Sequence, residues 1–389
     1  MTQPRIDKKT FNLIAGGAGV LAVLVLLFGV LDVKLPSLSF GKKQAAVQGP
    51  AYPIYDEASF TALTQNYHIE PPQAPSLTFD ISLPQEWTVE NVATDTSEAF
   101  SKQIIGDVAL LRSPYIGTNR PELRVQTTML RNDIEAATWL EHYILTNSYI
   151  PQDKVAAVSL TRAHGAFTYI NPEGKVMLVQ AAVHFNGREA VLARLEMPLA
   201  FQDALGFMQK RAIESFKLTA AEDKTVEEQK SFTLAELIKF NYPASWELAP
   251  PNLRDIDRLS VQLFNKNSAG TFQGYIQMFV IRRKPETSLE KETVRLRDYI
   301  TNAVRLNIDK MTEQRPLPAL SRFAFNRLET YSASSADNPN NPAQELRLIT
   351  LGNSDHYIFI MMLSPQRAVD LYNWGRNKRA LDLIAASLQ

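Results

Sequence analysis

The chain has 389 residues, of which 45% are hydrophobic and 21% are charged, a composition typical of folded protein. Lysine and arginine together number 41, as do aspartate and glutamate, so the formal net charge is zero. This balance gives no overall attraction to a polyanion, and we expect no nucleic-acid partner. The absence of cysteine excludes disulfides, thiolate zinc sites, iron–sulfur clusters and thiol nucleophiles.

A short flank, residues 1–10, precedes an uncharged apolar run over residues 11–31. A run of about 21 residues, rising about 1.5 Å per residue as a helix, spans roughly 30 Å of hydrocarbon. It therefore predicts one transmembrane helix. A cleaved signal peptide is the alternative, but its apolar core is usually shorter and ends at a small-residue cleavage site. Here Asp32, Lys34 and Pro36 follow instead.

Basic residues flank the apolar run on both sides: Arg5, Lys8 and Lys9 before it, and Lys34, Lys42 and Lys43 after it. The two flanks are nearly balanced under the positive-inside rule. We favour a cytoplasmic flank at residues 1–10, because it is short and basic while the later lysine pair lies farther from the helix. The expected location is the bacterial inner membrane, with a single pass and the C-terminal domains in the periplasm.

Small residues recur at helical spacing inside the apolar run, at Ala15 and Gly19 and at Ala18 and Ala22. Four-residue spacing places each pair on one helix face, where a second helix can approach closely. The face is a candidate helix–helix contact with a partner or with a second copy in a homo-oligomer. The alternative is that glycine and alanine are simply common in membrane helices.

Residues 32–75 read as a linker with a short helix near Asp56–Gln65. Four aromatic side chains occur in its second half: Tyr52, Tyr55, Phe60 and Tyr67. They either pack against the domain that follows or bind a partner, and we favour packing.

A first α+β domain is expected over residues 76–219. Phe79, Ile81 and Leu83 alternate with polar neighbours, which predicts a strand that ends at Pro84. Further predicted strands are Val108–Leu111, Leu123–Leu130, Ala166–Ile170, Val176–Phe185 and Val191–Met197. Apolar residues at helical spacing predict helices at Ile134–Asn147 and Phe201–Phe216.

After a charged linker at residues 220–231, a second α+β domain over residues 232–389 repeats this order. Pro84-x-x-Trp87 recurs as Pro243-x-x-Trp246, and the helical segment 208–216 recurs as 375–384 with a shared Lys-Arg-Ala. Two matches in the same order indicate duplication. We place the extra residues of the second copy in the polar loop Ser332–Gln344.

The second domain carries its own set of predicted elements. The strands are Ile238–Tyr242, Leu259–Phe264, Tyr275–Ile281, Phe323–Tyr331, Glu345–Leu351 and Tyr357–Leu363, and the long helices are Leu289–Lys310 and Ala368–Leu388. The predicted fold class is α+β: a transmembrane helix, then two duplicated domains, each an antiparallel sheet packed with helices.

An opening strand that ends in Pro-x-x-Trp, followed by a strand, a helix, a strand meander and a closing helix, resembles the PsbP/Mog1/DcrB-like α/β/α sandwich group. The resemblance covers both units, in tandem. It implies a non-enzymatic role as an assembly subunit or adaptor, and it transfers no catalytic residue. The tandem arrangement behind an anchor departs from the group's usual single domain. For Trp87 and Trp246 themselves we expect core packing.

No catalytic motif occurs in the sequence: it has no metal-spaced histidine pair, Gly-x-Ser-x-Gly elbow, phosphate loop or dinucleotide fingerprint. The histidines are His68, His142, His164, His184 and His356, and each is expected to be a surface or half-buried side chain. The acids Asp255 and Asp257 read as a solvated loop. The basic clusters 282–284 and 376–379 read as a strand end and a helix face, with lipid head-group contact as the alternative.

These observations favour a non-enzymatic, membrane-anchored scaffold or accessory subunit of a bacterial envelope assembly, such as secretion or conjugation machinery. Its expected partners are other envelope or membrane proteins, with no cofactor and no metal. The alternative is a periplasmic protein that binds or senses a small molecule or lipid in a cleft between the two domains. An enzyme would require a constellation that folding assembles from distant residues.

Overall fold

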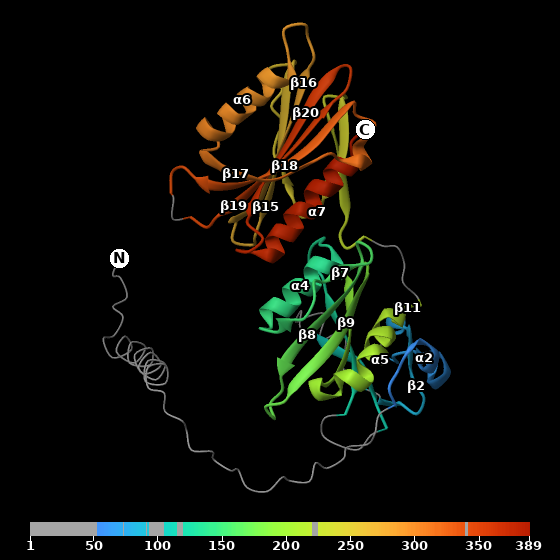
Figure 1. Cartoon of the computed structure of the whole chain (residues 1–389). Coiled ribbons are helices and arrows are strands. Elements are labelled where there is room, and N and C mark those ends of the chain that lie inside the picture. The colour runs from blue at the N-terminus through green and yellow to red at the C-terminus, as the bar shows by residue number, and fades with distance from the viewer. Residues whose placement is uncertain are drawn as a thin grey trace, which may run out of the picture. The chain divides into compact units, whose positions relative to one another are not determined.

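The computed structural model describes residues 53–72, 74–90, 92, 105–114, 120–219, 225–338 and 341–389 (Figure 1). These residues belong to one compact unit, Tyr52–Gln389. The apolar run 11–31, with Ala15, Ala18, Gly19 and Ala22, lies outside the described residues. Within the described part of the chain, no helix combines the length and the apolarity needed to cross a membrane.

The described chain opens with a short helix and a strand. Helix α2 (Glu57–Leu63) begins at Asp56, whose carboxylate accepts a hydrogen bond from the Ser59 N–H in a capping box. It lies where a short helix was predicted. Strand β1 (Thr64–Ile69) follows directly and pairs antiparallel with β2 (Phe79–Pro84). Tyr55 and Phe60 are buried in the core of the first domain, so the expectation that these aromatics pack against it is confirmed.

The first domain is built on one antiparallel sheet with the strand order β3-β4-β5-β10-β9-β8-β6, and β7 pairs with β8. The strands are β3 (Thr88–Glu90), β4 (Gly106–Arg112), β5 (Glu122–Met129), β6 (Ile150–Pro151), β7 (Ala156–Ala157), β8 (Arg162–Ile170), β9 (Val176–Asn186) and β10 (Glu189–Pro198). A smaller sheet joins β1, β2 and β11 (Lys217–Leu218). Short 3₁₀ turns occur at Pro75–Leu77 and Leu199–Phe201.

Helices cover both faces of this sheet. Helix α4 (Ala136–Thr146) packs on β8 and β9 over one face, and α5 (Gln202–Ser215) packs with β2 over the other. Phe79, Ile81 and Leu83 all point into the α5-side core, as the alternation of this strand predicted. Both helices of this domain were predicted, with ends that differ by one or two residues.

The second domain repeats the arrangement. Its main sheet has the order β14-β15-β16-β20-β19-β18-β17, and β12 pairs with β13 in a separate hairpin. The strands are β12 (Gln229–Leu234), β13 (Ile238–Pro243), β14 (Glu247–Leu248), β15 (Arg258–Lys266), β16 (Phe272–Arg282), β17 (Leu306–Arg315), β18 (Phe325–Ser335), β19 (Gln344–Gly352) and β20 (His356–Pro365). The helices are α6 (Leu289–Asn302) and α7 (Leu371–Ser387), with a 3₁₀ turn at Pro318–Leu320.

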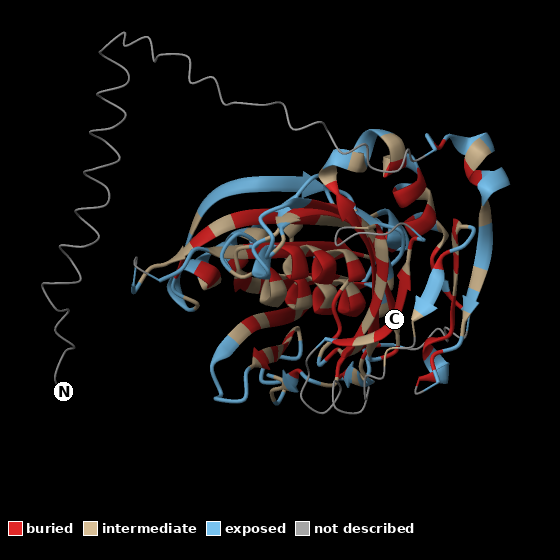
Figure 2. Ribbon diagram, turned by 90° about the horizontal axis from the view of Figure 1, so that it is seen from below, coloured by how far each residue is buried: buried red, intermediate tan, exposed pale blue. Residues whose placement is uncertain are grey.

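The two main sheets have the same strand order, except that the first has two short strands, β6 and β7, where the second has the single strand β17. In each domain an antiparallel strand pair comes first, and three strands, a helix, the edge strand or strands, three meander strands and a closing helix follow. Trp87 and Trp246 are both buried, as predicted. Figure 2 shows that buried residues concentrate where helix and strand faces meet one another. A mixed α+β fold with antiparallel sheets is therefore confirmed.

One predicted helix is too long. The prediction Leu289–Lys310 is wrong after Asn302, where α6 ends. The backbone N–H groups of Ala303 and Val304 both donate to the Tyr299 carbonyl, and Arg305 then adopts a positive φ of 62°. The residues beyond form β17, which pairs with β18. Strands β17 and β18 are consecutive along the chain, but the helical spacing used for the prediction gave no sign of their pairing.

The extra residues of the second domain are also placed differently from the prediction. Because β18 runs to Ser335 and β19 starts at Gln344, the polar loop is shorter than the predicted Ser332–Gln344. The connection from the helix to the next long strand (β8 or β18) differs more, spanning 303–324 in the second domain against 147–161 in the first. Strand β17 lies within that longer connection.

Candidate functional site

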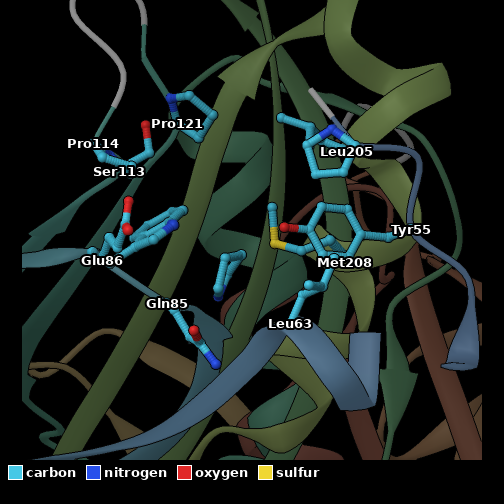
Figure 3. A pocket seen from close by; sticks show the side chains of 12 residues that line it. Tyr55, Leu63, Gln85, Glu86, Ser113, Pro114, Pro121, Leu205 and Met208 are labelled. Atoms are coloured by element: carbon cyan, nitrogen blue, oxygen red, sulfur yellow. The ribbon is translucent and has the colours of Figure 1, made fainter. Parts of the chain in front are cut away.

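A recess beside Trp87, here called the Trp87 recess, is the most site-like cavity of the first domain. Its volume is about 190 Å³, and it is half open to solvent (Figure 3). Four separate stretches of the chain line it: Pro53, Tyr55 and Leu63; Pro84, Gln85, Glu86 and Trp87; Ser113, Pro114 and Pro121; and Leu205 and Met208. Proline, aromatic and aliphatic side chains dominate this lining, as in sites for small apolar ligands.

The turn between β2 and β3 positions Glu86 and Trp87. Pro84 ends β2, and the Trp87 backbone N–H then donates to the Tyr67 hydroxyl over 3.0 Å. Glu86 has φ = 71°, in the left-handed region that a residue with a Cβ seldom adopts. This conformation costs roughly 1–2 kcal/mol. It places the exposed carboxylate at the rim of the Trp87 recess.

A buried hydroxyl lies in the same wall. Ser113 follows β4 and is 1% exposed, and its backbone N–H donates to the Pro121 carbonyl over 3.1 Å. Its Oγ has no hydrogen-bond partner within the described part of the chain. Figure 3 shows Ser113 and Glu86 on one side of the recess and Tyr55, Leu205 and Met208 on the other. An unsatisfied buried hydroxyl costs about 1–3 kcal/mol.

The electrostatics of the Trp87 recess are one-sided. Among the described residues, Glu86 is the only charged side chain that lines the recess, and it forms no ion pair with another described residue. The described part of the lining also contains no histidine and no second acid.

The corresponding turn of the second domain is closed. There the Trp246 N–H donates to the Pro243 carbonyl over 3.0 Å, so a backbone hydrogen bond within the turn stabilises it. The residue before the tryptophan is Ser245, whose hydroxyl donates to Glu227 over 2.9 Å. Of these two turns, only that of the first domain combines a positive-φ acid with a nearby hydroxyl that lacks a partner in the described chain.

A second unusual feature is a buried arginine on the α4-side face of the first sheet. The Arg194 guanidinium donates to Glu196 and to the Tyr143 hydroxyl, each over 3.1 Å. It also lies 5.7 to 5.9 Å from the ring centres of Tyr149, Phe167 and Tyr169. Three ring faces stabilise a buried cation where its Nε has no hydrogen-bond partner in the described chain.

The pKa values of two neighbouring carboxyl groups beside this arginine shift in opposite directions. Burial and the nearby Glu122 raise the pKa of Glu196. Burial alone would raise the pKa of Glu122 too, but hydrogen bonds from Glu196 and Arg124 outweigh it and lower that pKa. On the α6-side face of the second domain, β16 and β20 carry Tyr275, Met361 and Leu363 at this place. That domain has a different buried charged group, since Glu292 of α6 is 1% exposed and pairs with Arg258 and Arg295.

Helices α4 and α7 form the junction of the two domains. The Lys378 ammonium lies 2.7 Å from Glu135 and 2.7 Å from Asp382, and Arg379 Nε lies 3.1 Å from Asp133. Burial raises the pKa of Asp133 despite this arginine. Gly375 of α7 faces Thr138 of α4. A cavity of about 310 Å³ lies beside the junction; among its described lining residues, Arg379 is the only one from the second domain and Phe185 is the only aromatic.

The residues singled out from the sequence do not assemble into one site. His68 contacts Asp80 and Glu70, His142 lies against Tyr372, and His184 packs on Phe216 in the core. No group of three metal-ligating side chains occurs within the described ranges.

The acidic loop and the basic clusters are likewise engaged within the protein. Asp257 pairs with Arg282 and Lys284, and its pKa is lowered by the hydrogen bond from Lys284. Lys378 and Arg379 are held in the α4–α7 junction. Head-group contact by these basic clusters would require breaking those ion pairs.

Sequence reasoning missed Glu86, Ser113 and the Trp87 recess. The lining residues come from positions 53–63, 84–87, 113–121 and 205–208, and their types are ordinary for turns and helices. Of the sequence motifs, Pro-x-x-Trp is the one that contributes residues to this lining, and its tryptophan was expected to pack in the core. That interpretation is right for the buried indole, yet the indole also forms a wall of the recess.

No protein-family model matches the chain, and no curated protein matches it significantly. Among solved structures, cyanobacterial PsbP (CyanoP) from Synechocystis sp. PCC 6803 is 13% identical over 40% of this chain and 93% of its own, with a TM-score of 0.29. A protein from Bacteroides thetaiotaomicron is 10% identical over 41% of this chain and 47% of its own, with a TM-score of 0.25. A PsbP fold is thus among the neighbours, at TM-scores too low to support a functional argument.

Proposed function

We propose that the protein is a non-enzymatic accessory subunit or scaffold of a bacterial envelope assembly, such as secretion or conjugation machinery. It is anchored in the inner membrane by one helix at residues 11–31, and its two domains bind other envelope proteins in the periplasm. A second copy is a further partner, through the face formed by Ala15, Ala18, Gly19 and Ala22.

The α4–α7 junction is the observation that carries this proposal. Ion pairs at Lys378 and Arg379 and the close approach of Gly375 to Thr138 hold the two domains against each other. Burial would lower the pKa of Lys378, but Asp382 and Glu135 raise it more, so the cation is retained in the junction. A platform that positions partners needs such a fixed joint, whereas a flexible linker between domains would leave their spacing undefined.

The matching strand order supports duplication of a PsbP-like sandwich as the origin of the two domains. The charged network around Arg194 and the open Trp87 recess then mark the first copy as the one specialised for binding. In this interpretation the second copy fixes the position of the first through α7.

The test is a crosslinking pull-down of the full-length protein from its native membrane, with an anchor-exchanged chain alongside. We expect a reproducible set of envelope proteins, reduced when the anchor is replaced. Gly375→Leu, which drives a side chain into Thr138, should lose partners that contact both domains. Gly206→Leu in α5 is the matched control, because its Cβ position meets only the flexible Gln202 side chain at 3.5 Å. Recovery of the protein alone would contradict the proposal.

The second candidate function is small-molecule or lipid binding. The Trp87 recess favours it, because an apolar cavity of about 190 Å³ is suited to a ligand of about one ring. The candidate site for this function lies within the first domain, whereas the expectation from the sequence was a cleft between the two domains. Binding of a small apolar probe that saturates, and that competes with no envelope partner, would distinguish this function from the first.

A further inference from the structure

We propose that the Trp87 recess binds a small organic cation: an amine carried on an apolar body of about one aromatic ring. This inference rests on the second candidate function and names the ligand class for that same recess. Three features of the recess point to it, namely its size, its single charged side chain among the described residues, and the strained backbone at Glu86.

The size of the recess limits the apolar body of the ligand. A cavity of about 190 Å³ is close to the volume that admits a benzene-sized molecule, and too small for a lipid with two acyl chains. Tyr55 and Trp87 supply aromatic rings to the lining, and Leu205 and Met208 supply aliphatic contact from α5. A single ring or a short branched chain would fill this space.

The charge of the recess determines whether the ligand is a cation or an anion. The Glu86 carboxylate stands at the rim with no cation beside it in the described chain, and the remaining lining is neutral. An ammonium group there would meet a carboxylate and one or more ring faces together, the arrangement that aromatic sites for organic cations use. An anion of the same shape would be repelled by the same carboxylate.

The backbone conformation at Glu86 is a further reason to assign the charged contact with the ligand to this residue. A residue with a Cβ is held at φ = 71° in this turn, although the second domain closes its own turn without positive φ. Strained backbone concentrates at binding sites, where it orients a side chain that the ligand needs. Here the strained residue is the one that carries the charge.

The experiment uses the full-length protein in lipid nanodiscs at pH 7.5, with binding followed by fluorine NMR. Three probes share one ring and differ in charge: 4-fluorophenethylamine, 2-(4-fluorophenyl)ethanol and 4-fluorophenylacetate. Signals from empty nanodiscs are subtracted, because the amine also partitions into lipid. We expect the amine to bind about fivefold more tightly than the alcohol, and the acetate to bind most weakly.

Matched variants assign the preference to residues. Glu86→Gln should remove the preference for the amine, whereas Glu236→Gln should leave it intact, since Glu236 is also an exposed glutamate at positive φ (60°) but lies in the second domain. Leu63→Trp, which fills the mouth, should abolish binding of the amine and the alcohol. Leu253→Trp, a similarly exposed leucine of the second domain, should not.

Two results would overturn the proposal, and they differ in what they leave standing. Equal binding of amine and alcohol, or a Glu86→Gln protein that behaves like Glu236→Gln, rejects the cation while leaving an apolar ligand site. The absence of saturable binding by any probe rejects the recess as a ligand site altogether. Neither result bears on partners recovered by the pull-down, so failure of the scaffold function is recognised separately.

Discussion

Gly375 of α7 lies so close to Thr138 of α4 that a Cβ built on the glycine would come 2.5 Å from the threonine Cγ2. No real Cβ tolerates that distance, so any larger residue at 375 must push the two helices apart. The contact joins the two domains, and the glycine is therefore required by tertiary packing and not by helix formation.

Replacing this glycine tests the junction. We expect Gly375→Ala to destabilise the protein by about 1–3 kcal/mol, because overpacking outweighs the gain in helix propensity of about 1 kcal/mol. Chemical denaturation of the full-length protein measures it. Gly206→Ala in α5 is the control and should stabilise slightly, and Thr138→Ala should recover part of the loss at Gly375→Ala. Equal stability of the two glycine variants would contradict the close contact.

The buried imidazole of His184 predicts a loss of stability in acid. Burial, with Arg162 and His164 nearby, lowers the pKa of His184 to about 4. The unfolded chain binds this proton near pH 6.5 and the folded protein does not, so stability falls as the pH drops from about 6.5 toward 4. The full effect is about 3 kcal/mol. His184→Phe should flatten this part of the profile, measured by denaturation at several pH values.

The exposed His68 serves as a contrast to His184. Hydrogen bonds to Asp80 and Glu70 raise the pKa of His68. The stabilisation of the folded state by protonated His68 is thus present below about pH 6.5, and it is lost as the pH rises through the pKa of His68 in the folded protein. His68→Gln should change the profile slightly and with the opposite sign. A His184→Phe protein with an unchanged acid limb would show that another group causes the acid loss.

The carboxyl pair predicts a stability loss on the alkaline side. The pKa of Glu196 is raised above its unfolded value, so its contribution is complete below about pH 4.5 and is lost as the pH rises through the folded pKa. Glu196→Gln, which cannot ionise and keeps an acceptor for Arg194, should be more stable than the parent by about 1–2 kcal/mol at pH 8 and equal to it near pH 4. Glu122→Gln should destabilise at both neutral and alkaline pH, because Arg124 loses a partner.

A buried amide cluster holds α7 to its sheet. Asn377 is fully buried; its carbonyl accepts from Asn265 over 2.8 Å, and its amide donates to the Gln273 carbonyl and to Ser364. Asn377→Ala leaves these buried groups without partners, and we expect a loss of about 2–4 kcal/mol in thermal or chemical unfolding. Asn307→Ala, at an exposed position on β17, should cost little. A small loss at Asn377→Ala would mean that water replaces the amide.

Local sequence patterns predicted the secondary structure of the first domain well. Phe79, Ile81 and Leu83 alternate because one face of β2 is buried, and the spacing around Trp139 and Tyr143 reflects one buried face of α4. The same reasoning failed at β17, because most of its residues are exposed and show no apolar alternation that would reveal the pairing with β18. The helical spacing of apolar residues therefore did not show where α6 ends.

Short-range periodicity in the chain was enough to define the apolar run at residues 11–31, the repeated Pro-x-x-Trp, the order of most strands and the mixed α+β class. The binding features depend on tertiary packing. Glu86, Ser113, Tyr55 and Leu205 meet only when β2, β4 and α5 pack together, and Gly375 meets Thr138 only when the domains dock. Proximity between distant residues depends on how the elements pack, and the chemistry of a site depends on that proximity.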